Sequence, residues 1–357
     1  MKSLYEKINL GGIEVRNRFV RSGTHENMTF DGTVTPEIID IYKKLAEEEV
    51  GLIITSSIEV TEEKVLNTSL RIYDDSYINS FKKLTSAVHE AEGKILAQLL
   101  YGGSQVFCKI DYETLGPSAV QDRFSKIIPK AMTNDDIFNI IECFSDAALR
   151  SKMANFDGVQ INAASGFLLN KFLSPFYNRR SDEYGGSIEN RSRFLVEIRE
   201  AIAKKCGRDF PVFIKLSVDD FMNDDVKGLE FPDGKEIAKV LAESGYDAIE
   251  VSGGLPSEIG GSRRPTVNYN GKDPYFKNHI IELSKEVQTP LISVGGIRTE
   301  EVAQELINFD HIEAVSFSRP FICDPDLVKR WKKGEKARCT SCYQCNGPKG
   351  IRCVLNK

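Results

Sequence analysis

The stretch Leu291–Pro320, LISVGGIRTEEVAQELINFDHIEAVSFSRP, contains the unit from which the fold of this protein follows. It opens with the apolar run Leu291–Gly296 and closes with a second one, Ala314–Pro320. Between them, Thr299 and the acidic residues after it predict the start of a helix, because threonine caps a first turn and the helix dipole favours negative charge there. A helix joining two such strands predicts a parallel pair, since parallel strands need a crossover connection.

The same alternation runs through the chain of 357 residues. Thr35, followed by Pro36, and Ser187 are further predicted helix N-caps, and proline is tolerated at the first helical position because it lacks an N–H that would be unpaired there. Six more apolar runs are predicted strands: Arg18–Gly23, Gly51–Ser57, Ile95–Tyr101, Gly158–Ala163, Val212–Val218 and Ala248–Gly254. Eight strand–helix units in succession predict an α/β protein with a single (β/α)8 TIM barrel.

Two segments lie outside this alternation. Residues 8–17 predict a β-hairpin that turns at Gly11 and Gly12 and caps the N-terminal end of the barrel. Residues 102–132 predict a long loop over the opposite end. We assign residues 1–335 to the barrel, and residues 336–357 to a Cys-rich C-terminal extension that is not an independent domain.

Composition and charge narrow the class of protein. The formal net charge of −5 gives no reason to expect nucleic acid or an anionic membrane as a partner. The chain has no apolar run of membrane-spanning length, and its start, MKSLYEKINL, lacks the apolar core of a signal peptide. We therefore expect a cytoplasmic protein with a small-molecule substrate, in which the cysteines are thiols. The oligomeric state is left open.

The loops after the last two strands predict a phosphate site. Gly295 and Gly296 follow the seventh strand and Arg319 follows the eighth, and TIM barrels often bind phosphate between these two loops. The glycines allow the backbone to approach an anion closely, and the forked guanidinium suits phosphate. A simple tight turn is the alternative interpretation of the two glycines.

Two polar side chains interrupt otherwise apolar strands. Lys215 stands in VFIKLSV and Gln98 in LAQLL, and burial between strand and helix would be costly for both. A cation and an amide beside a phosphate site predict an FMN isoalloxazine ring, whose reduced form the cation stabilises and whose pyrimidine edge the amide binds. A lysine that extends to solvent and a buried core glutamine are the alternatives.

The stretch Phe172–Phe194, FLSPFYNRRSDEYGGSIENRSRF, resembles the signature of the Old Yellow Enzyme family of NAD(P)H:flavin oxidoreductases. Similar matches at Val15–Thr35, Ser293–Glu301 and Phe317–Trp331 extend the resemblance over nearly the whole chain. The family implies FMN inside the barrel, with contacts from Ser22, Gly23, Thr24, Ser57, Gln98, Lys215, Gly296, Ser318 and Arg319. It also implies that His25 tunes the flavin.

After the fourth strand the family usually carries His, two residues, His or Asn, one residue, and then Tyr. Those positions are Asn162, Ser165 and Phe167 in this chain. The amide and the hydroxyl can still donate hydrogen bonds to a substrate oxygen, so we predict that Asn162 and Ser165 bind the substrate. Two imidazoles and a phenol are missing, which predicts a roomier, less polar mouth and a bulky, largely apolar substrate.

Phe167 cannot supply the proton that the family's tyrosine supplies. Tyr101, His25 and Tyr177 are the candidate proton donors that remain, with water as the alternative. We predict catalytic roles for Tyr101, at the end of the third strand, and for His25.

Cys339, Cys342, Cys345 and Cys353 form the array CTSCYQCNGPKGIRC near the C-terminus. Three closely spaced cysteines with a separate fourth commonly hold a [4Fe–4S] cluster, whereas structural zinc more often uses two spaced pairs. A cluster is therefore the leading prediction, with zinc and unliganded thiols as alternatives. A cluster would make an external electron carrier a partner.

The sequence predicts an FMN-dependent oxidoreductase that takes hydride from NAD(P)H and reduces an activated C=C bond of an unsaturated carbonyl compound. Two alternatives stay open. One is a non-catalytic flavoprotein or electron carrier, suggested by the missing tyrosine. The other is an aldolase or isomerase that acts on a phosphorylated substrate in the same barrel.

Overall fold

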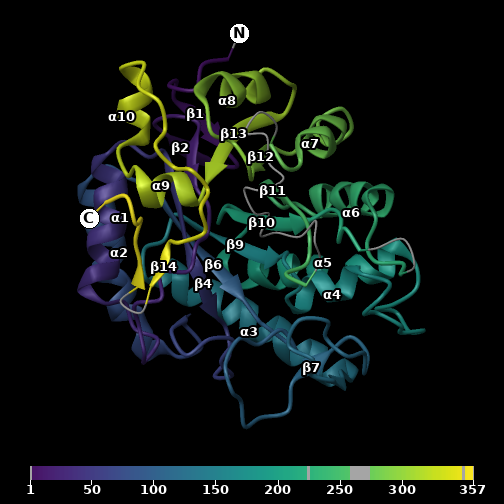
Figure 1. Cartoon of the computed structure of the whole chain (residues 1–357). Helices are drawn as coiled ribbons and strands as arrows, with labels where there is room; N and C mark the ends of the chain where they lie inside the picture. Colours follow the sequence, from purple (N-terminus) through teal and green to yellow (C-terminus); the bar gives the residue numbers. More distant parts are fainter. Residues whose placement is uncertain (1, 223–225, 258–273, 348–349, 357) are drawn as a thin grey trace.

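The structure is a computed structural model that describes residues 2–222, 226–257, 274–347 and 350–356, and its centre is a closed parallel barrel (Figure 1). In chain order the barrel strands are β3 (Phe19–Arg21), β4 (Leu52–Glu59), β6 (Ile95–Leu100), β9 (Gly158–Ala163), β10 (Val212–Ser217), β11 (Ala248–Ser252), β12 (Leu291–Val294) and β13 (Ile312–Phe317). Strand β3 pairs both with β13 and with β4, which closes the sheet. The predicted (β/α)8 fold is confirmed.

Helices surround the barrel (Figure 1). They are α1 (Pro36–Glu47), α2 (Ile78–Glu90), α3 (Asn134–Met153), α4 (Leu168–Leu173), α5 (Ile188–Cys206), α6 (Phe231–Glu243), α7 (Lys277–Leu283), α8 (Glu300–Ile307), α9 (Arg319–Cys323) and α10 (Leu327–Lys332), with the 3-10 helix η1 (Asp75–Tyr77) before α2. Each predicted N-cap accepts a hydrogen bond from a backbone N–H three residues further on: Thr35, Ser187 and Thr299. No helix in the described part of the chain is long and apolar enough to cross a membrane.

The N-terminal hairpin closes one end of the barrel, as predicted. Strands β1 (Ile8–Leu10) and β2 (Ile13–Val15) pair in antiparallel fashion, and their apolar side chains cluster with residues from inside the barrel. Gly11, at φ +54°, has no room for a side chain, since a Cβ there would lie 2.6 Å from the carbonyl oxygen of Asp247.

Several short strands escape sequence prediction. They are β5 (Leu70–Arg71), β7 (Leu115–Gly116), β8 (Lys130–Ala131), β14 (Asn346–Gly347) and β15 (Gly350–Ile351). Two residues carry no alternating pattern, so nothing in the sequence marks them. Strands β7 and β8 pair with each other and give the base of the predicted loop at residues 102–132 a fixed geometry.

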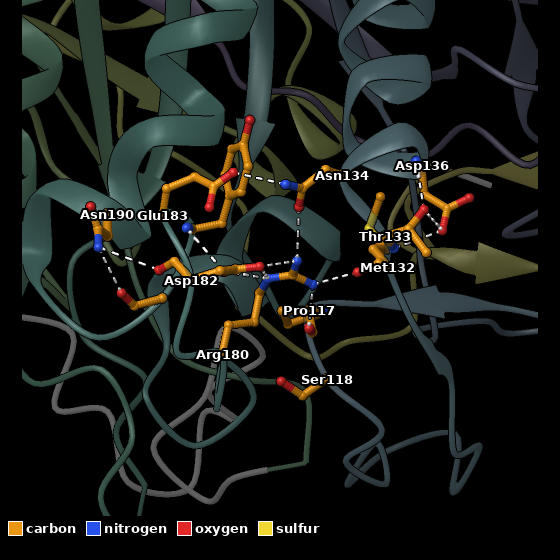
Figure 2. Close-up of polar contacts among 12 residues, drawn as sticks. Pro117, Ser118, Met132, Thr133, Asn134, Asp136, Arg180, Asp182, Glu183 and Asn190 are labelled. Carbon is orange, nitrogen blue, oxygen red and sulfur yellow. Dashed lines mark hydrogen bonds and ion pairs between the residues drawn. The ribbon is translucent and has the colours of Figure 1, made fainter.

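Arg180, in the signature stretch, holds the same insertion in place (Figure 2). Its guanidinium donates to the carbonyl oxygens of Pro117 and Met132, on the two sides of the insertion, and forms an ion pair with Asp182. It also donates to the side chain of Asn134 at the start of α3. The signature thus has a structural role, because one planar cation joins three separate segments.

A buried ion pair gives the insertion a second anchor. The Nζ atom of Lys171, on α4, lies 2.6 Å from a carboxylate oxygen of Asp122 in the insertion, and each side chain is only 1% exposed. Lys171 also donates to the hydroxyl of Ser104 over 2.7 Å. Breaking such a pair leaves an uncompensated buried charge, so the insertion has a strongly preferred position on α4.

Candidate active site

Two adjoining cavities occupy the C-terminal ends of the barrel strands. Their volumes are about 460 and 410 Å3, and four residues line both: Gly23, His25, Ser165 and Lys215. Every predicted cofactor residue lines one or both cavities: Ser22, Gly23, Thr24, Ser57, Gln98, Lys215, Gly295, Gly296, Ser318 and Arg319. These residues come from six of the eight strand ends, and the other two, β9 and β11, contribute Asn162 and Ser252 to the lining.

The larger cavity contains the predicted phosphate site. Gly295 and Gly296 have φ values of +93° and +82°, and a Cβ on either would come within 2.9 Å of the Tyr275 ring. Both positions therefore need glycine, for backbone conformation and for space. Arg319 donates to the Tyr275 hydroxyl over 3.0 Å and lies 4.3 Å from the centre of the Tyr343 ring.

The positive charge at this end is larger than the sequence analysis predicted. The contacts of Arg319 in the described residues are a phenol, a backbone carbonyl and an aromatic ring, all uncharged, so its charge is available to an anion. Arg298 lines the same cavity and donates to the Ser341 hydroxyl over 2.9 Å. Its position directly after the glycine loop was the signal that could have identified it.

The junction of the cavities is built around a buried carboxylate. The Lys215 ammonium donates to the Ser22 hydroxyl over 2.8 Å and lies 3.4 Å from Oε1 of Glu250, whose side chain is fully buried. Oε1 also accepts hydrogen bonds from the Ser22 and Ser316 hydroxyls over 2.7 and 2.8 Å. Burial alone would raise the pKa of Glu250, but the lysine and these donors hold it below its ordinary value.

A chain of amides leads from Glu250 to the smaller cavity. The Gln160 amide nitrogen donates to Oε2 of Glu250 over 3.0 Å, and its oxygen accepts from the Gln98 amide over 2.7 Å. The Gln98 oxygen in turn accepts from the Ser57 hydroxyl over 2.7 Å and from the Asn162 amide over 3.1 Å. Four strands thus share one continuous hydrogen-bonded network.

Sequence reasoning missed Glu250 and Gln160, although the signal was present. Each interrupts an apolar strand, AIEVSGG or GVQINA, in the same way that Lys215 interrupts VFIKLSV. In the barrel register Lys215 lies directly beside Glu250 on the neighbouring strand, and Gln98 beside Gln160. The argument that identified one polar residue therefore applied to all of them.

The turn after β9 presents Ser165 to the cavities in a strained conformation. Ser165 has a φ of +58°, its backbone N–H donates to the Ser217 hydroxyl over 3.2 Å, and its carbonyl accepts from the Gln105 amide. The next N–H, of Gly166, donates to Asn170 over 2.7 Å. Because three separate contacts fix the turn, Ser165 has a defined direction.

His25 is neutral in this environment. Burial lowers its pKa to about 4. The Thr68 hydroxyl donates its single proton to Asn27 over 2.6 Å, so it accepts from Nε2 of His25, 2.9 Å away. The imidazole therefore carries its proton on Nε2 and is an acceptor at Nδ1, which argues against a role as proton donor.

Tyr101 and Tyr177 line neither cavity. Gln98 and Leu100 line the smaller cavity, and alternate residues of a strand face opposite sides, so Tyr101 points to the layer between barrel and helices. The Tyr177 ring lies over the buried Lys171 ammonium. Neither phenol is therefore part of the walls of the two cavities in the described residues.

The four C-terminal cysteines differ in their surroundings. Cys353 is buried, Cys342 is exposed, and Cys345 lines the larger cavity beside the predicted phosphate site. Burial raises the pKa of Cys345, and the nearby Cys339 and Cys353 raise it further. Outside the array, Cys323 is a buried thiol whose pKa is raised by burial and by a hydrogen bond with Cys353.

These thiols do not form a ligand set as they stand. In residues 2–222, 226–257, 274–347 and 350–356, no three His, Cys, Asp or Glu side chains are arranged to hold a metal ion. The predicted cluster or zinc site is thus not shown.

A closed (β/α)8 barrel with glycines, arginines, a lysine and an amide around the cavities at its strand ends is typical of TIM barrels that bind a phosphate-containing cofactor. A sequence model of the NADH:flavin oxidoreductase / NADH oxidase family matches residues 3–338, and the chain belongs to that family. The resemblance inferred from the sequence is confirmed.

Individual relatives agree with this assignment. The chain is 35% identical to an NADH oxidase of Thermoanaerobacter brockii, over 96% of this chain and 53% of the relative, and 32% identical to a cinnamate reductase of Clostridium sporogenes, over 97% and 56%. The structure of an Old Yellow Enzyme homologue from Zymomonas mobilis superposes with a TM-score of 0.78 at 26% identity and covers 98% of both chains. The chain spans about half the length of the two curated relatives.

The lowered pKa of His25 predicts a pH dependence of folding. The unfolded chain protonates this imidazole below its ordinary pKa of about 6.5, whereas the folded chain resists protonation down to about 4. Above pH 6.5 the imidazole is neutral in both the folded and the unfolded state. As the pH falls from 6.5 to 4, only the unfolded chain takes up a proton at His25, so the free energy of unfolding decreases.

The free energy of unfolding, measured with urea, should fall more steeply over this range for the wild type than for His25→Asn, by roughly 1 to 3 kcal/mol. The same two proteins should show parallel pH dependence between pH 7 and 8. Equal slopes below pH 6.5 would show that His25 is as easily protonated in the folded protein as in the unfolded chain.

Proposed function

We propose that this protein binds FMN across the two cavities, takes hydride from NAD(P)H, and reduces the activated C=C bond of a bulky, largely apolar unsaturated carbonyl compound. The observation that supports this best is that Lys215 lines both cavities, while Gln98 lines the smaller one and Arg319 the larger one. FMN, when bound, supplies the hydride-transfer chemistry. Family membership favours this function over the aldolase or isomerase alternative.

The residues present fit the chemical groups of FMN. The two arginines and the side-chain-free backbone at Gly295 and Gly296 suit the phosphate. Lys215 and Gln98 suit the pyrimidine edge, where negative charge develops on reduction. Gly23 also fits, because a Cβ there would lie 2.3 Å from the Gln98 amide nitrogen, so only glycine leaves this amide in place.

The smaller cavity supports the substrate class. Asn162 and Ser165 both line it, and their N–H and O–H groups can donate hydrogen bonds to a carbonyl oxygen of the substrate. The outer wall is aromatic, since Phe107 of the insertion lies edge-to-face with Phe167, ring centres 6.4 Å apart. Such a wall favours a substrate with an aromatic or other flat apolar group, and one relative carries the name cinnamate reductase.

In this proposal one carbon of the C=C bond receives the hydride, and the proton that the other carbon needs comes from water. The described residues that line the smaller cavity include hydroxyls, amides, the neutral His25 and Lys215, but no phenol and no carboxylic acid. A hydroxyl such as that of Ser165 can pass a proton from solvent, although it is too weak an acid to originate one.

Removing Arg319 tests whether FMN occupies the larger cavity. The wild type should bind FMN and be yellow, and Arg319→Ala should bind it about 10- to 100-fold more weakly, because a charge-assisted phosphate contact is lost. Fluorescence titration of stripped protein gives both constants, with Arg16→Ala, beside the N-terminal hairpin, as a matched control that retains wild-type affinity. A wild type that stays colourless with added FMN would refute the proposal.

Removing the aromatic wall tests the substrate class. Under anaerobic conditions the reduced flavin should be reoxidised by an aryl-conjugated enone faster than by a small aliphatic enone. Phe107→Ala should lower kcat/KM for the aryl substrate roughly 10-fold and leave the small enone nearly unchanged, since only the larger substrate reaches the wall. Phe138→Ala removes an exposed ring on α3 as a control. Equal losses for both substrates would place Phe107 outside the specificity pocket.

The cysteine array requires a separate test, because the structure does not show a ligand set. Protein purified without oxygen should contain about four iron and four sulfide per chain if the leading prediction holds, and one zinc without sulfide for the alternative. Cys342→Ser should then lose the metal, whereas Cys143→Ser, on α3, should keep it. Absence of both metals from the wild type would leave free thiols and remove the reason to expect an external electron carrier.

A further inference from the structure

Glu250 has no role in the proposed chemistry, yet both of its carboxylate oxygens have hydrogen-bond partners beside the site. It lies on β11 with a side-chain exposure of 0%. Both carboxylate oxygens are engaged, Oε1 by Ser22, Ser316 and the nearby Lys215 and Oε2 by Gln160. A charge placed this deeply is costly unless it is paired and hydrogen-bonded, which makes its presence informative.

We propose that Glu250 is a positioning residue for the flavin and substrate groups: its carboxylate holds the Lys215 ammonium in place and fixes the direction of the amide chain from Gln160 through Gln98 to Asn162. This inference rests on the proposed function, because it concerns the residues that would face FMN.

The first part of the argument is charge. Lys215 is the charged residue shared by both cavities, and its Nζ lies 3.4 Å from Glu250 Oε1 with the Ser22 hydroxyl bridging the two groups. A carboxylate at this distance offsets much of the positive potential that the ammonium projects into the cavity. A bound flavin therefore experiences a partly compensated cation, and Glu250 keeps reduction from becoming too favourable.

The second part is hydrogen-bond direction. An ionised carboxylate accepts only, so Gln160 must direct its NH2 group toward Glu250 and its oxygen toward Gln98. Gln98 must then direct its NH2 toward Gln160, which leaves its oxygen to accept from Ser57 and Asn162. Each amide has a single orientation because the buried acid specifies the first one.

The chain ends at the predicted substrate residue. Asn162 accepts the backbone N–H of Ala164 at its oxygen over 3.2 Å, so its NH2 group faces the Gln98 oxygen and, 3.4 Å away, the Ser57 hydroxyl at the cavity wall. A donor is what a substrate carbonyl oxygen requires. Glu250 thus supports, through two intervening amides, the same orientation of Asn162 that the Ala164 N–H selects, with the NH2 group as the donor on the cavity side.

Glu250→Gln tests the charge argument with little change in shape. The affinity for reduced FMN, divided by the affinity for oxidised FMN, should rise at least 10-fold. This corresponds to a rise of about 30 mV in the two-electron midpoint potential of the bound flavin. Glu250→Asp retains the charge and should stay within about threefold of the wild-type ratio. An unchanged or lower potential in Glu250→Gln overturns the charge argument, while a wild type without FMN affinity would instead refute the proposed function.

Gln160→Leu tests the direction argument, because it interrupts the amide chain and leaves the Lys215–Glu250 pair intact. Reoxidation of the reduced flavin by enone should slow at least 10-fold, while the midpoint potential should shift less than in Glu250→Gln. Wild-type reoxidation in this variant overturns the orienting role.

A stability measurement covers the case in which Glu250→Gln folds poorly. Lys215→Gln leaves the buried carboxylate without its cation, so the double variant Lys215→Gln/Glu250→Gln should unfold at a higher urea concentration than Lys215→Gln alone. Both proteins lack the lysine, so a common excess of FMN affects them similarly. A double variant less stable than the single one would show that the two groups are not coupled.

Discussion

The closure of the barrel through β3 is the constraint on which the site depends. Strand β3 has only three residues, Phe19–Arg21, yet it pairs with β13 on one side and β4 on the other. Closure brings the C-terminal ends of all eight strands to one rim, so that Ser22 after β3 reaches Lys215 on β10 and Glu250 on β11. In an open sheet the first and last strands would be far apart, and this network could not form.

Inside the barrel, apolar and polar groups occupy different levels. The end near the hairpin is filled by a separate apolar cluster that includes Val20, Leu52 and Phe213. The level nearer the cavities contains the Lys215–Glu250 pair and the amide chain. Burial of charge there costs free energy, and it is tolerated because every oxygen of Glu250 is hydrogen-bonded and the cation is adjacent. The apolar level stabilises the fold while the polar level supplies the chemistry.

Much of this architecture could be predicted from the sequence, because its elements carry local patterns. The strands are apolar since both faces are buried, and the helix caps are threonine or serine since the first backbone N–H groups need an acceptor. The cavity residues Lys215, Gln98, Gly295 and Arg319 could be identified because each lies in a predicted strand or at its C-terminal end. The prediction for Tyr101 did not use strand alternation, which sends this side chain to the opposite face from Gln98. Arg180 and the two-residue strands depend on contacts distant in sequence, which no local pattern reports.

The aromatic wall of the smaller cavity, formed by Phe107 and Phe167, depends on such contacts between residues distant in sequence. Phe107 lies in an insertion with little regular structure, so the barrel alone does not determine its position. Arg180 fixes both sides of this insertion, and the buried Lys171–Asp122 pair fixes its middle. Because these anchors order the insertion in the absence of a ligand, a ligand that contacts it has little ordering cost to offset. The signature stretch therefore holds in place an insertion whose residue Phe107 lines the smaller cavity.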